Sequence, residues 1–179
     1  MLSVCLLAGC GRKMNLETVA DVVSTQIPEP MGQVSVTFPN DAVIDVMESE
    51  DGATLYQCDG YSVTIQTLAS GDMNRSLQTV SGYEKEELNL IATKQEGLDR
   101  YDWVFTAAGE SGDQVFRCAL LDDGNFHYVV TAMAPAETAG QLRETWNELF
   151  STVCLVSTDS ELPDKAPYTD PLQTGDIGS

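Results

Sequence analysis

The chain has 179 residues, of which 42% are hydrophobic, and its formal net charge is −19. This length and composition suffice for one compact domain that is stabilised by burial of apolar side chains. Residues 15–156 contain 23 acidic and only 6 basic side chains. Because affinity for nucleic acids comes mainly from Lys and Arg, the composition excludes nucleic acid as a partner.

The N-terminus is a short apolar run that ends in Leu6-Leu7-Ala8-Gly9-Cys10. This run resembles the lipobox of bacterial lipoproteins. The resemblance implies that Cys10 is the first residue of the mature protein and carries a diacylglyceryl group. Two acyl chains hold a protein on a membrane far more durably than one chain does. Cys10 is therefore the expected lipidation site, and the protein is expected on the extracytoplasmic face of the cell membrane.

Only nine uncharged residues precede Cys10, whereas a secretory signal normally opens with basic residues and spans about 15–30 residues. We therefore interpret residues 1–9 as a truncated lipoprotein signal peptide and residues 10–14 as the tether. No later segment approaches the 18 or more apolar residues that a membrane-spanning helix needs. The acyl group on Cys10 is expected to be the only membrane attachment.

Removal of Cys5 with the signal and acylation of Cys10 would leave Cys58, Cys118 and Cys154 in the mature protein. One disulfide among these three is permitted outside the cytoplasm. Their apolar surroundings in the sequence also fit buried free thiols, which we favour slightly. The chain has no Cys-x-x-Cys spacing, so neither a redox dithiol nor a structural zinc site is indicated.

The first half of the chain is expected to contain two helices and several strands. Residues 15–26 have apolar side chains at helical spacing and predict an amphipathic helix, while alternation over 34–38 predicts a strand and 41–47 a second extended piece. Two strands flank Asp59-Gly60, a pair that favours a type I′ hairpin turn. Residues 72–80, bounded by Gly71 and Gly82, predict the second helix.

The second half predicts four consecutive strands joined by short, turn-rich segments. Such connections favour antiparallel neighbours, and therefore a meander. The expected strands cover residues 88–92, 101–107, 115–121 and 126–133. A long final helix is predicted from Pro135 to Val153, with an apolar stripe that includes Trp146. Residues 157–179 are rich in proline and acidic side chains and predict a disordered acidic tail.

These elements predict an α+β fold, a single antiparallel sheet flanked by helices. The pattern resembles the PsbP/DcrB-like family, whose fold is also that of the Ran-binding protein Mog. The resemblance covers most of residues 33–156, and these matching segments carry it: Val34 to Phe38 before Pro39, the Asp59-Gly60 hairpin, the helix end Val80-Ser81-Gly82-Tyr83, and Phe126 to Thr131. It implies a PsbP-like α-β-α sandwich over residues 15–156 and a non-enzymatic binding or assembly role, with no transferable site.

Two features of the sequence suggest catalysis, His127 and the segment 109–112, but neither is part of a complete catalytic motif. His127 is the only histidine and lies on a predicted strand, with Phe126 and Tyr128 on the opposite face. A catalytic role would need a nucleophile and an orienting acid, and the sequence places neither beside it. The segment 109–112 resembles a nucleophile elbow, but the closing glycine is replaced by Asp113, so a hairpin turn is expected.

No metal or cofactor site is expected either. The carboxylates of Asp45, Glu48, Glu50 and Asp51 could gather around calcium, but their spacing is not that of an EF-hand loop and a solvated loop is the better interpretation. The aromatic residues could line a cleft, although most aromatics at strand and helix spacing belong to a core. They are Tyr56, Tyr61, Tyr83, Tyr101, Trp103 and Trp146.

The sequence favours a membrane-anchored extracytoplasmic lipoprotein that acts as a non-catalytic binding or assembly module, with another cell-envelope protein as the expected partner. The alternative is a solute- or carbohydrate-binding or carbohydrate-active lipoprotein, in which acidic and aromatic side chains share a cleft. The identity of the partner stays open at this point.

Overall fold

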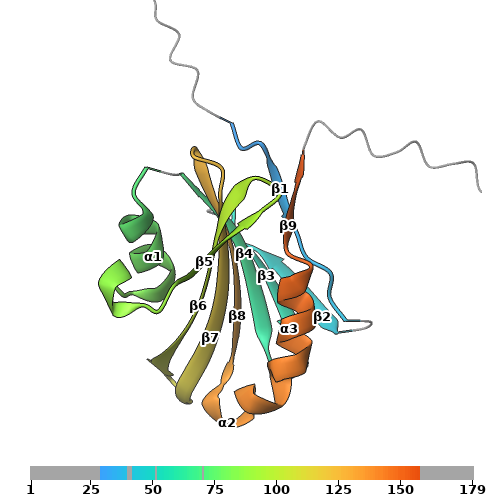
Figure 1. The fold of residues 1–179 in the computed structure, drawn as a ribbon. Helices are drawn as coiled ribbons and strands as arrows, with labels where there is room; N and C mark the ends of the chain where they lie inside the picture. Colours follow the sequence, from blue (N-terminus) through green and yellow to red (C-terminus); the bar gives the residue numbers. More distant parts are fainter. Residues whose placement is uncertain (1–28, 40–41, 51, 70, 158–179) are drawn as a thin grey trace, which may run out of the picture.

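The computed structural model describes residues 29–39, 42–50, 52–69 and 71–157 (Figure 1). Cys10, the predicted helix at 15–26 and the predicted tail beyond Ser157 lie outside the described residues. The strands are β1 (Gly32–Ser35), β2 (Val43–Glu48), β3 (Thr54–Cys58), β4 (Ser62–Ala69), β5 (Ile91–Gln95), β6 (Leu98–Gly109), β7 (Gly112–Asp122), β8 (Phe126–Pro135) and β9 (Cys154–Ser157). The helices are α1 (Met73–Ser81), α2 (Ala136–Ala139) and α3 (Arg143–Ser151), with 3₁₀ turns η1 (Lys85–Glu87) and η2 (Gly140–Leu142).

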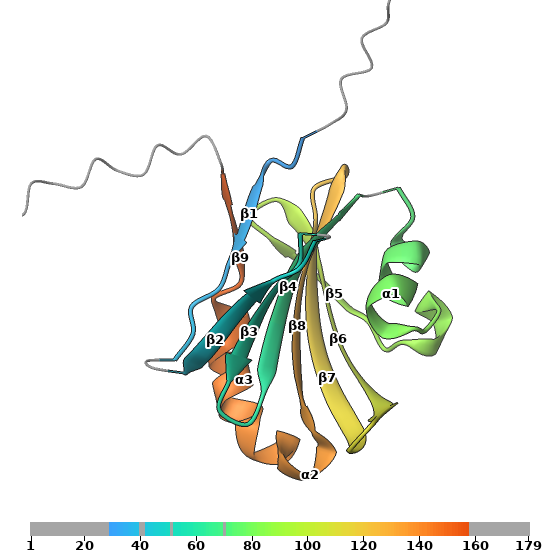
Figure 2. The ribbon, with the colours of Figure 1, turned by 180° about the vertical axis from the view of Figure 1, so that it is seen from behind.

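The main sheet has seven strands in the order β2-β3-β4-β8-β7-β6-β5, and every neighbouring pair is antiparallel. Helix α1 covers one face and α2 with α3 the other, as the two opposite views show (Figures 1 and 2). The fold is therefore α+β, with one large antiparallel sheet between helices, as predicted. Strands β1 and β9 form a separate two-stranded ribbon, which the sequence did not predict.

The alternation of side chains along the meander creates two core layers. In β8, Tyr128, Val130 and Ala132 point to the α3 face, where they pack with buried side chains of α3. The intervening Val129 packs on the α1 face with Leu77 of the helix. The side chains at the centre of both layers are nearly fully buried, so the central strands carry apolar side chains on both faces of the sheet.

The hairpin turns differ in detail from the prediction. The β3–β4 hairpin forms as expected, and Gly60 has a φ of +77°. Asp59 does not have a positive φ, however, so the predicted type I′ turn is wrong at this place. A two-residue turn with positive φ at both positions joins β5 and β6 instead, at Glu96 (φ +53°) and Gly97 (φ +89°).

The predicted helix at 72–80 is confirmed as α1. Asp72 is its N-cap and accepts a hydrogen bond from the backbone N–H of Asn74, and Gly82 closes the helix in a left-handed conformation. Strand β5 begins three residues later than predicted. The reason is that η1 occupies Lys85–Glu87, and Leu88 and Leu90 then pack beneath α1 before the strand begins.

The predicted final helix is broken into α2, η2 and α3 around Gly140, a residue that weakens a helix interior. Its apolar stripe is confirmed, because Ala139, Trp146, Leu149 and Phe150 are buried against the sheet. The helix ends at Ser151, and the chain then forms β9. The Ser157 assigned to the tail pairs with Gly32 in the β1–β9 ribbon.

The three cysteines of the described domain, Cys58, Cys118 and Cys154, are free, as favoured from the sequence. Across the described ranges, no helix is both long and apolar enough to cross a bilayer.

Candidate functional site

The α3 side of the sheet is only partly covered. Helix α3 lies over the middle strands, whereas the face formed by β5, β6 and β7 is open beside it, and there Ile91 is 65% and Val104 59% exposed. The space between this open face and the helices has a volume of about 700 Å³. We call it the α3 groove. Its lining residues are Asn89, Ile91, Asp102, Trp103, Val104, Val115, Arg117, Ala136, Ala139, Gly140, Arg143, Trp146 and Asn147.

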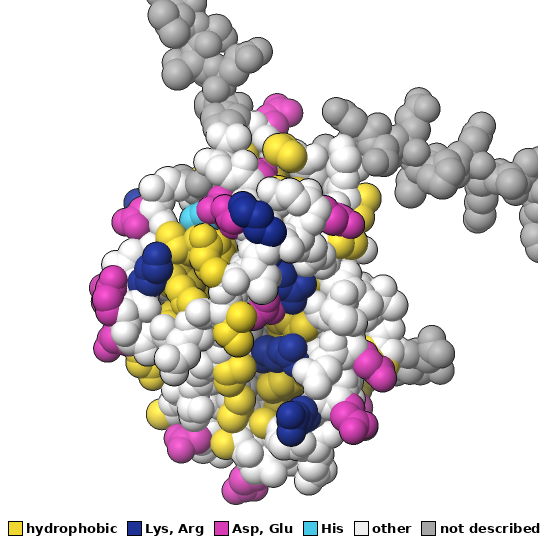
Figure 3. Space-filling view, in the orientation of Figure 1, with side chains coloured by type: hydrophobic (Ala, Val, Ile, Leu, Met, Phe, Trp, Pro, Cys, Tyr) yellow, Lys and Arg dark blue, Asp and Glu magenta, His cyan; other side chains and the backbone are white. Residues whose placement is uncertain are grey.

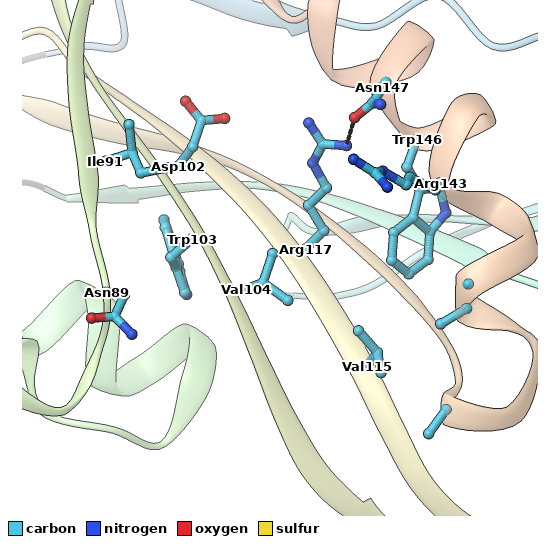
Figure 4. A pocket seen from close by; sticks show the side chains of 13 residues that line it. Asn89, Ile91, Asp102, Trp103, Val104, Val115, Arg117, Arg143, Trp146 and Asn147 are labelled. Carbon is cyan, nitrogen blue, oxygen red and sulfur yellow. Dashed lines mark hydrogen bonds between the residues drawn. The ribbon is translucent and has the colours of Figure 1, made fainter.

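Two arginines from different elements border the α3 groove (Figure 4). Arg117 comes from β7; its guanidinium lies 4.6 Å from the centre of the Phe150 ring and donates a 2.7 Å hydrogen bond to Oδ1 of Asn147. Arg143 comes from the first turn of α3 and is exposed. Among the described residues, no carboxylate lies within ion-pair distance of either guanidinium.

A third arginine nearby has a structural role. Arg100 donates two 2.8 Å hydrogen bonds to the carboxylate of Asp102, one to Gln95 and one to the backbone carbonyl of Phe150. Gln95 in turn donates to the carbonyl of Val153. The bonds to the carbonyls of Phe150 and Val153 hold the C-terminal end of α3 to β5 and β6 at the edge of the groove. The charges of Arg100 and Asp102 largely neutralise each other, because the two side chains pair directly.

The groove is locally basic on a chain of strongly acidic composition. A second hollow, which shares Ile91, Asp102, Arg117 and Asn147 with it, extends past Arg100 to Lys94. Figure 3 shows Lys and Arg side chains gathered beside hydrophobic ones on this face. Burial lowers the pKa of Arg117, and Arg100 acts in the same direction against the opposing effect of Asp102. An arginine nevertheless stays protonated in proteins, so an incoming anion would meet a partly desolvated cation.

Trp146 belongs both to the core and to the groove wall. Its side chain is only 4% exposed and packs with the α3 core layer, which confirms the predicted orientation of the final helix. It also lines the α3 groove, and its indole N–H has no hydrogen-bond partner within the described part of the chain. A buried Trp N–H usually has a partner. This nitrogen is itself buried, so the part of Trp146 that contributes to the groove wall is the apolar ring.

A second cluster surrounds His127, which is 2% exposed on the α1 side of the sheet. Its Nδ1 lies 2.7 Å from Oγ of Ser76 in α1, and its Nε2 lies 3.5 Å from a carboxylate oxygen of Asp122 in β7. The structure therefore places a serine and a carboxylate on either side of the imidazole, which sequence spacing did not reveal. The sequence analysis, which placed neither group beside His127, missed both partners.

The geometry of this cluster is that of a structural contact. Ser76 is 4% exposed, so its hydroxyl is closed to a substrate carbonyl while α1 stays in place. A hollow of about 430 Å³ lies beside it. The Ser76–His127 hydrogen bond therefore fastens α1 to β8.

The other residues considered from the sequence do not form a site. Asp45 and Glu48 are exposed on the edge strand β2, Glu50 follows in an exposed turn, and Asp51 lies outside the described residues. No three metal-ligating side chains converge in the parts of the chain that the structure describes. Residues 109–112 form the β6–β7 hairpin turn, as predicted.

The aromatic cleft, which the sequence left as the alternative to a core role, forms only in part. Trp103 and Trp146 line the α3 groove, although the side chain of Trp103 packs in the α1 core layer. Tyr61 is buried in the α3 layer, and Tyr83 donates a hydrogen bond to the carbonyl of Thr106. The groove contains a single carboxylate, Asp102, so acidic and aromatic side chains do not converge there.

The comparisons with known proteins concern the fold. No protein-family model and no curated protein matches the chain. Among solved structures, cyanobacterial PsbP (CyanoP) from Synechocystis sp. PCC 6803 is similar at 6% identity and a TM-score of 0.49, over 71% of this chain and 95% of that one. LpqN, described as involved in cell envelope biogenesis of Mycobacterium tuberculosis, is similar at 13% identity and a TM-score of 0.44, over 69% and 83%.

A protein from Bacteroides thetaiotaomicron is similar at 12% identity and a TM-score of 0.47, over 72% of this chain. The match spans half of that protein's length. At identities and TM-scores of this size, the similarity concerns the course of the backbone and carries no information about the residues that line the α3 groove.

Proposed function

We propose that this protein is a lipoprotein anchored through Cys10 on the extracytoplasmic face of the cell membrane, and that its folded domain binds a ligand or partner in the α3 groove without catalysing a reaction. The observation that carries the proposal is the groove itself. It combines exposed apolar side chains of the sheet, Ile91 and Val104, with two arginines that have no carboxylate partner among the described residues.

The chemistry of the groove favours binding over catalysis. Its lining contains no serine, threonine, cysteine, histidine, lysine or tyrosine. The one side chain there that could act as a nucleophile or a general base is Asp102, and both of its carboxylate oxygens accept hydrogen bonds from Arg100. What it offers is an apolar floor with a few convergent polar groups, the arrangement that ligand sites commonly have. A carbohydrate-active cleft would instead need a pair of carboxylates on either side of the substrate.

The anchor is tested by metabolic labelling and fractionation. A full-length chain supplied with a complete signal peptide should incorporate labelled palmitate and sediment with membranes after a high-salt wash, because acyl chains are not displaced by salt. Cys10→Ala should abolish both properties and leave the melting temperature unchanged. A Cys10→Ala protein that still sediments after the wash would show that the lipobox interpretation is wrong.

The groove is tested by photocrosslinking in cells. A photoreactive amino acid at Val104, which is exposed in the groove, should form adducts that disappear when Arg117 and Arg143 are changed to glutamine. The same amino acid at Ile44, which is 68% exposed on the distant edge strand β2, serves as the control. Equal adducts from both positions would argue against the groove as the binding surface.

A further inference from the structure

We propose that the α3 groove binds a single-chain amphiphile with one anionic headgroup, of the kind represented by a fatty acid. This inference rests on the proposed binding function of the groove and names the chemical class of its ligand. Two features of the groove carry it: the exposed apolar floor and the two arginines at its border.

The floor accounts for the apolar part of the ligand. Ile91 and Val104 are large aliphatic side chains that stand more than half exposed on neighbouring strands, and Val115 continues the same face on β7. An alkyl chain laid across them would remove apolar surface from water, at about 25 cal/mol for each Å² that is buried. The volume of about 700 Å³ is in the range of small-molecule sites.

The headgroup is assigned by the arginines. A guanidinium offers several donors in a planar fork that matches a carboxylate or phosphate. Arg117 is held in place by the Phe150 ring and by Asn147, so little side-chain entropy is lost when it binds. Arg100, by contrast, already donates four hydrogen bonds, to Asp102, Gln95 and the carbonyl of Phe150. Arg117 and Arg143 are thus the two cations that remain for a ligand.

The charge of the whole chain favours a small ligand over an acidic protein or an anionic membrane. With a net charge of −19, the protein repels large polyanionic surfaces at long range. A single headgroup inside the groove interacts mainly with the nearby guanidinium groups, because more distant charges are screened over about 8–10 Å. A basic groove in an otherwise acidic protein therefore favours a small ligand that has one anionic group and an apolar chain.

Titration calorimetry of the full-length chain carrying Cys10→Ser, which prevents acylation, tests the proposal. Decanoate below its micellar concentration should bind with one site per chain. The double variant Arg117→Gln, Arg143→Gln should lose about tenfold or more in affinity, because charge-assisted hydrogen bonds are removed. The double variant Arg75→Gln, Lys85→Gln removes the same charge from exposed positions on and after α1, and should bind as the parent does.

Further ligands separate the alternatives. Decyltrimethylammonium should bind more weakly than decanoate to the parent chain, and the Arg117 and Arg143 changes should not weaken its binding, because the two guanidinium groups repel a cationic headgroup. The proposal is overturned if decanoate does not bind, if its affinity is the same in both double variants, or if only phosphatidylglycerol vesicles bind in an Arg117-dependent way. None of these results bears on acylation of Cys10 or on crosslinks from Val104, so the proposed function can stand when this inference fails. Melting temperatures of all variants verify that each is folded.

Discussion

Gly32 and Val156 lie so close in the β1–β9 ribbon that a Cβ atom on Gly32 would be 2.2 Å from the carbonyl oxygen of Val156. Real Cβ atoms do not approach backbone atoms to such distances, so only glycine allows this pairing. The ribbon has a structural role, because Val34 and Leu155 from its two strands pack on the α3 core layer. The first and last described strands thereby close one end of the core.

Gly32→Ala is therefore expected to destabilise the protein. The backbone of β9 would have to shift, and overpacking of this kind costs about 1–3 kcal/mol of unfolding free energy. Gly140→Ala is the matched control, because nothing lies within 4 Å of its Cβ position and its φ of −62° suits any residue. That change should be neutral or stabilising by up to about 1 kcal/mol. Urea denaturation measures both, and equal effects would show that the ribbon does not depend on the close approach.

The sequence predicted those parts of the fold that depend on neighbours along the chain. Alternation of apolar residues located β6, β7 and β8, the capping residues Asp72 and Gly82 located α1, and the Asp59-Gly60 pair located a hairpin. Each of these signals lies within about a dozen residues. The first residue of β5 was predicted too early because Leu88 and Leu90 pack under α1, which is a tertiary contact.

The candidate site could not be predicted in the same way. Arg117 of β7 and Arg143 at the start of α3 are separated by a strand and a broken helix, and nothing in their spacing indicates that they border one groove. Strand β9 was missed because Cys154–Ser157 is only four residues long and closely follows the final helix, so it is too short for alternation to identify it as a strand. Its partner is β1, which lies more than a hundred residues earlier.

Ser76→Ala should destabilise the protein without removing an activity. The change leaves Nδ1 of the buried His127 without its partner, and an unsatisfied buried group costs about 1–3 kcal/mol. Thr79→Ala on the exposed side of α1 is the control and should stay within about 0.5 kcal/mol. A fluorophosphonate probe should not label the native chain. Labelling that Ser76→Ala abolishes would contradict a purely structural role.

The stability of the protein should fall in alkaline solution, and Tyr128 should account for part of the fall. Burial, together with its hydrogen bond to Asp123, raises the pKa of Tyr128 to about 12. The ordinary pKa of tyrosine is about 10. Because the folded state holds the proton more tightly, the stabilisation is complete below pH 10 and is lost as the pH rises to 12.

Unfolding by urea at a series of pH values measures this loss. Tyr128→Phe should be less stable at neutral pH, because the backbone N–H of Met31 and the carboxylate of Asp123 lose their partner. Its stability should nevertheless change less than that of the parent between pH 10 and 12. The buried thiol of Cys118, whose pKa burial also raises to about 12, contributes a further alkaline loss that remains in the variant. If the unfolding free energy of the two proteins falls equally steeply between pH 10 and 12, Tyr128 is not a source of the alkaline loss.

Removal of residues 158–179 should leave the melting temperature unchanged. This segment offers few apolar side chains for burial and begins directly after β9. Truncation before Cys154 is the contrasting variant and should lower the melting temperature, because it removes β9 and the contact of Leu155 with the core. A substantial loss of stability in the shorter truncation would show that Tyr168 or Leu172 packs on the domain.

Trp146→Ala should bring the protein close to unfolding. The ring is buried beside Leu149 and Phe150 at the centre of the α3 core layer, and truncation of such a side chain costs about 3–5 kcal/mol. A typical domain has a total stability of about 5–15 kcal/mol, so this loss is a large share. Asn147→Ala, at the next position on the exposed side of the helix, is the control and should change stability much less.

Trp146→Phe tests whether the volume of the ring carries the structural role of this residue. The phenyl ring fills most of the same space, so the melting temperature should fall much less than in Trp146→Ala. Because the indole N–H is buried, the affinity for decanoate should also change little. If Trp146→Ala keeps the parent melting temperature, the ring does not support the core, and α3 must be rotated from the orientation that buries its Leu149 and Phe150 side chains.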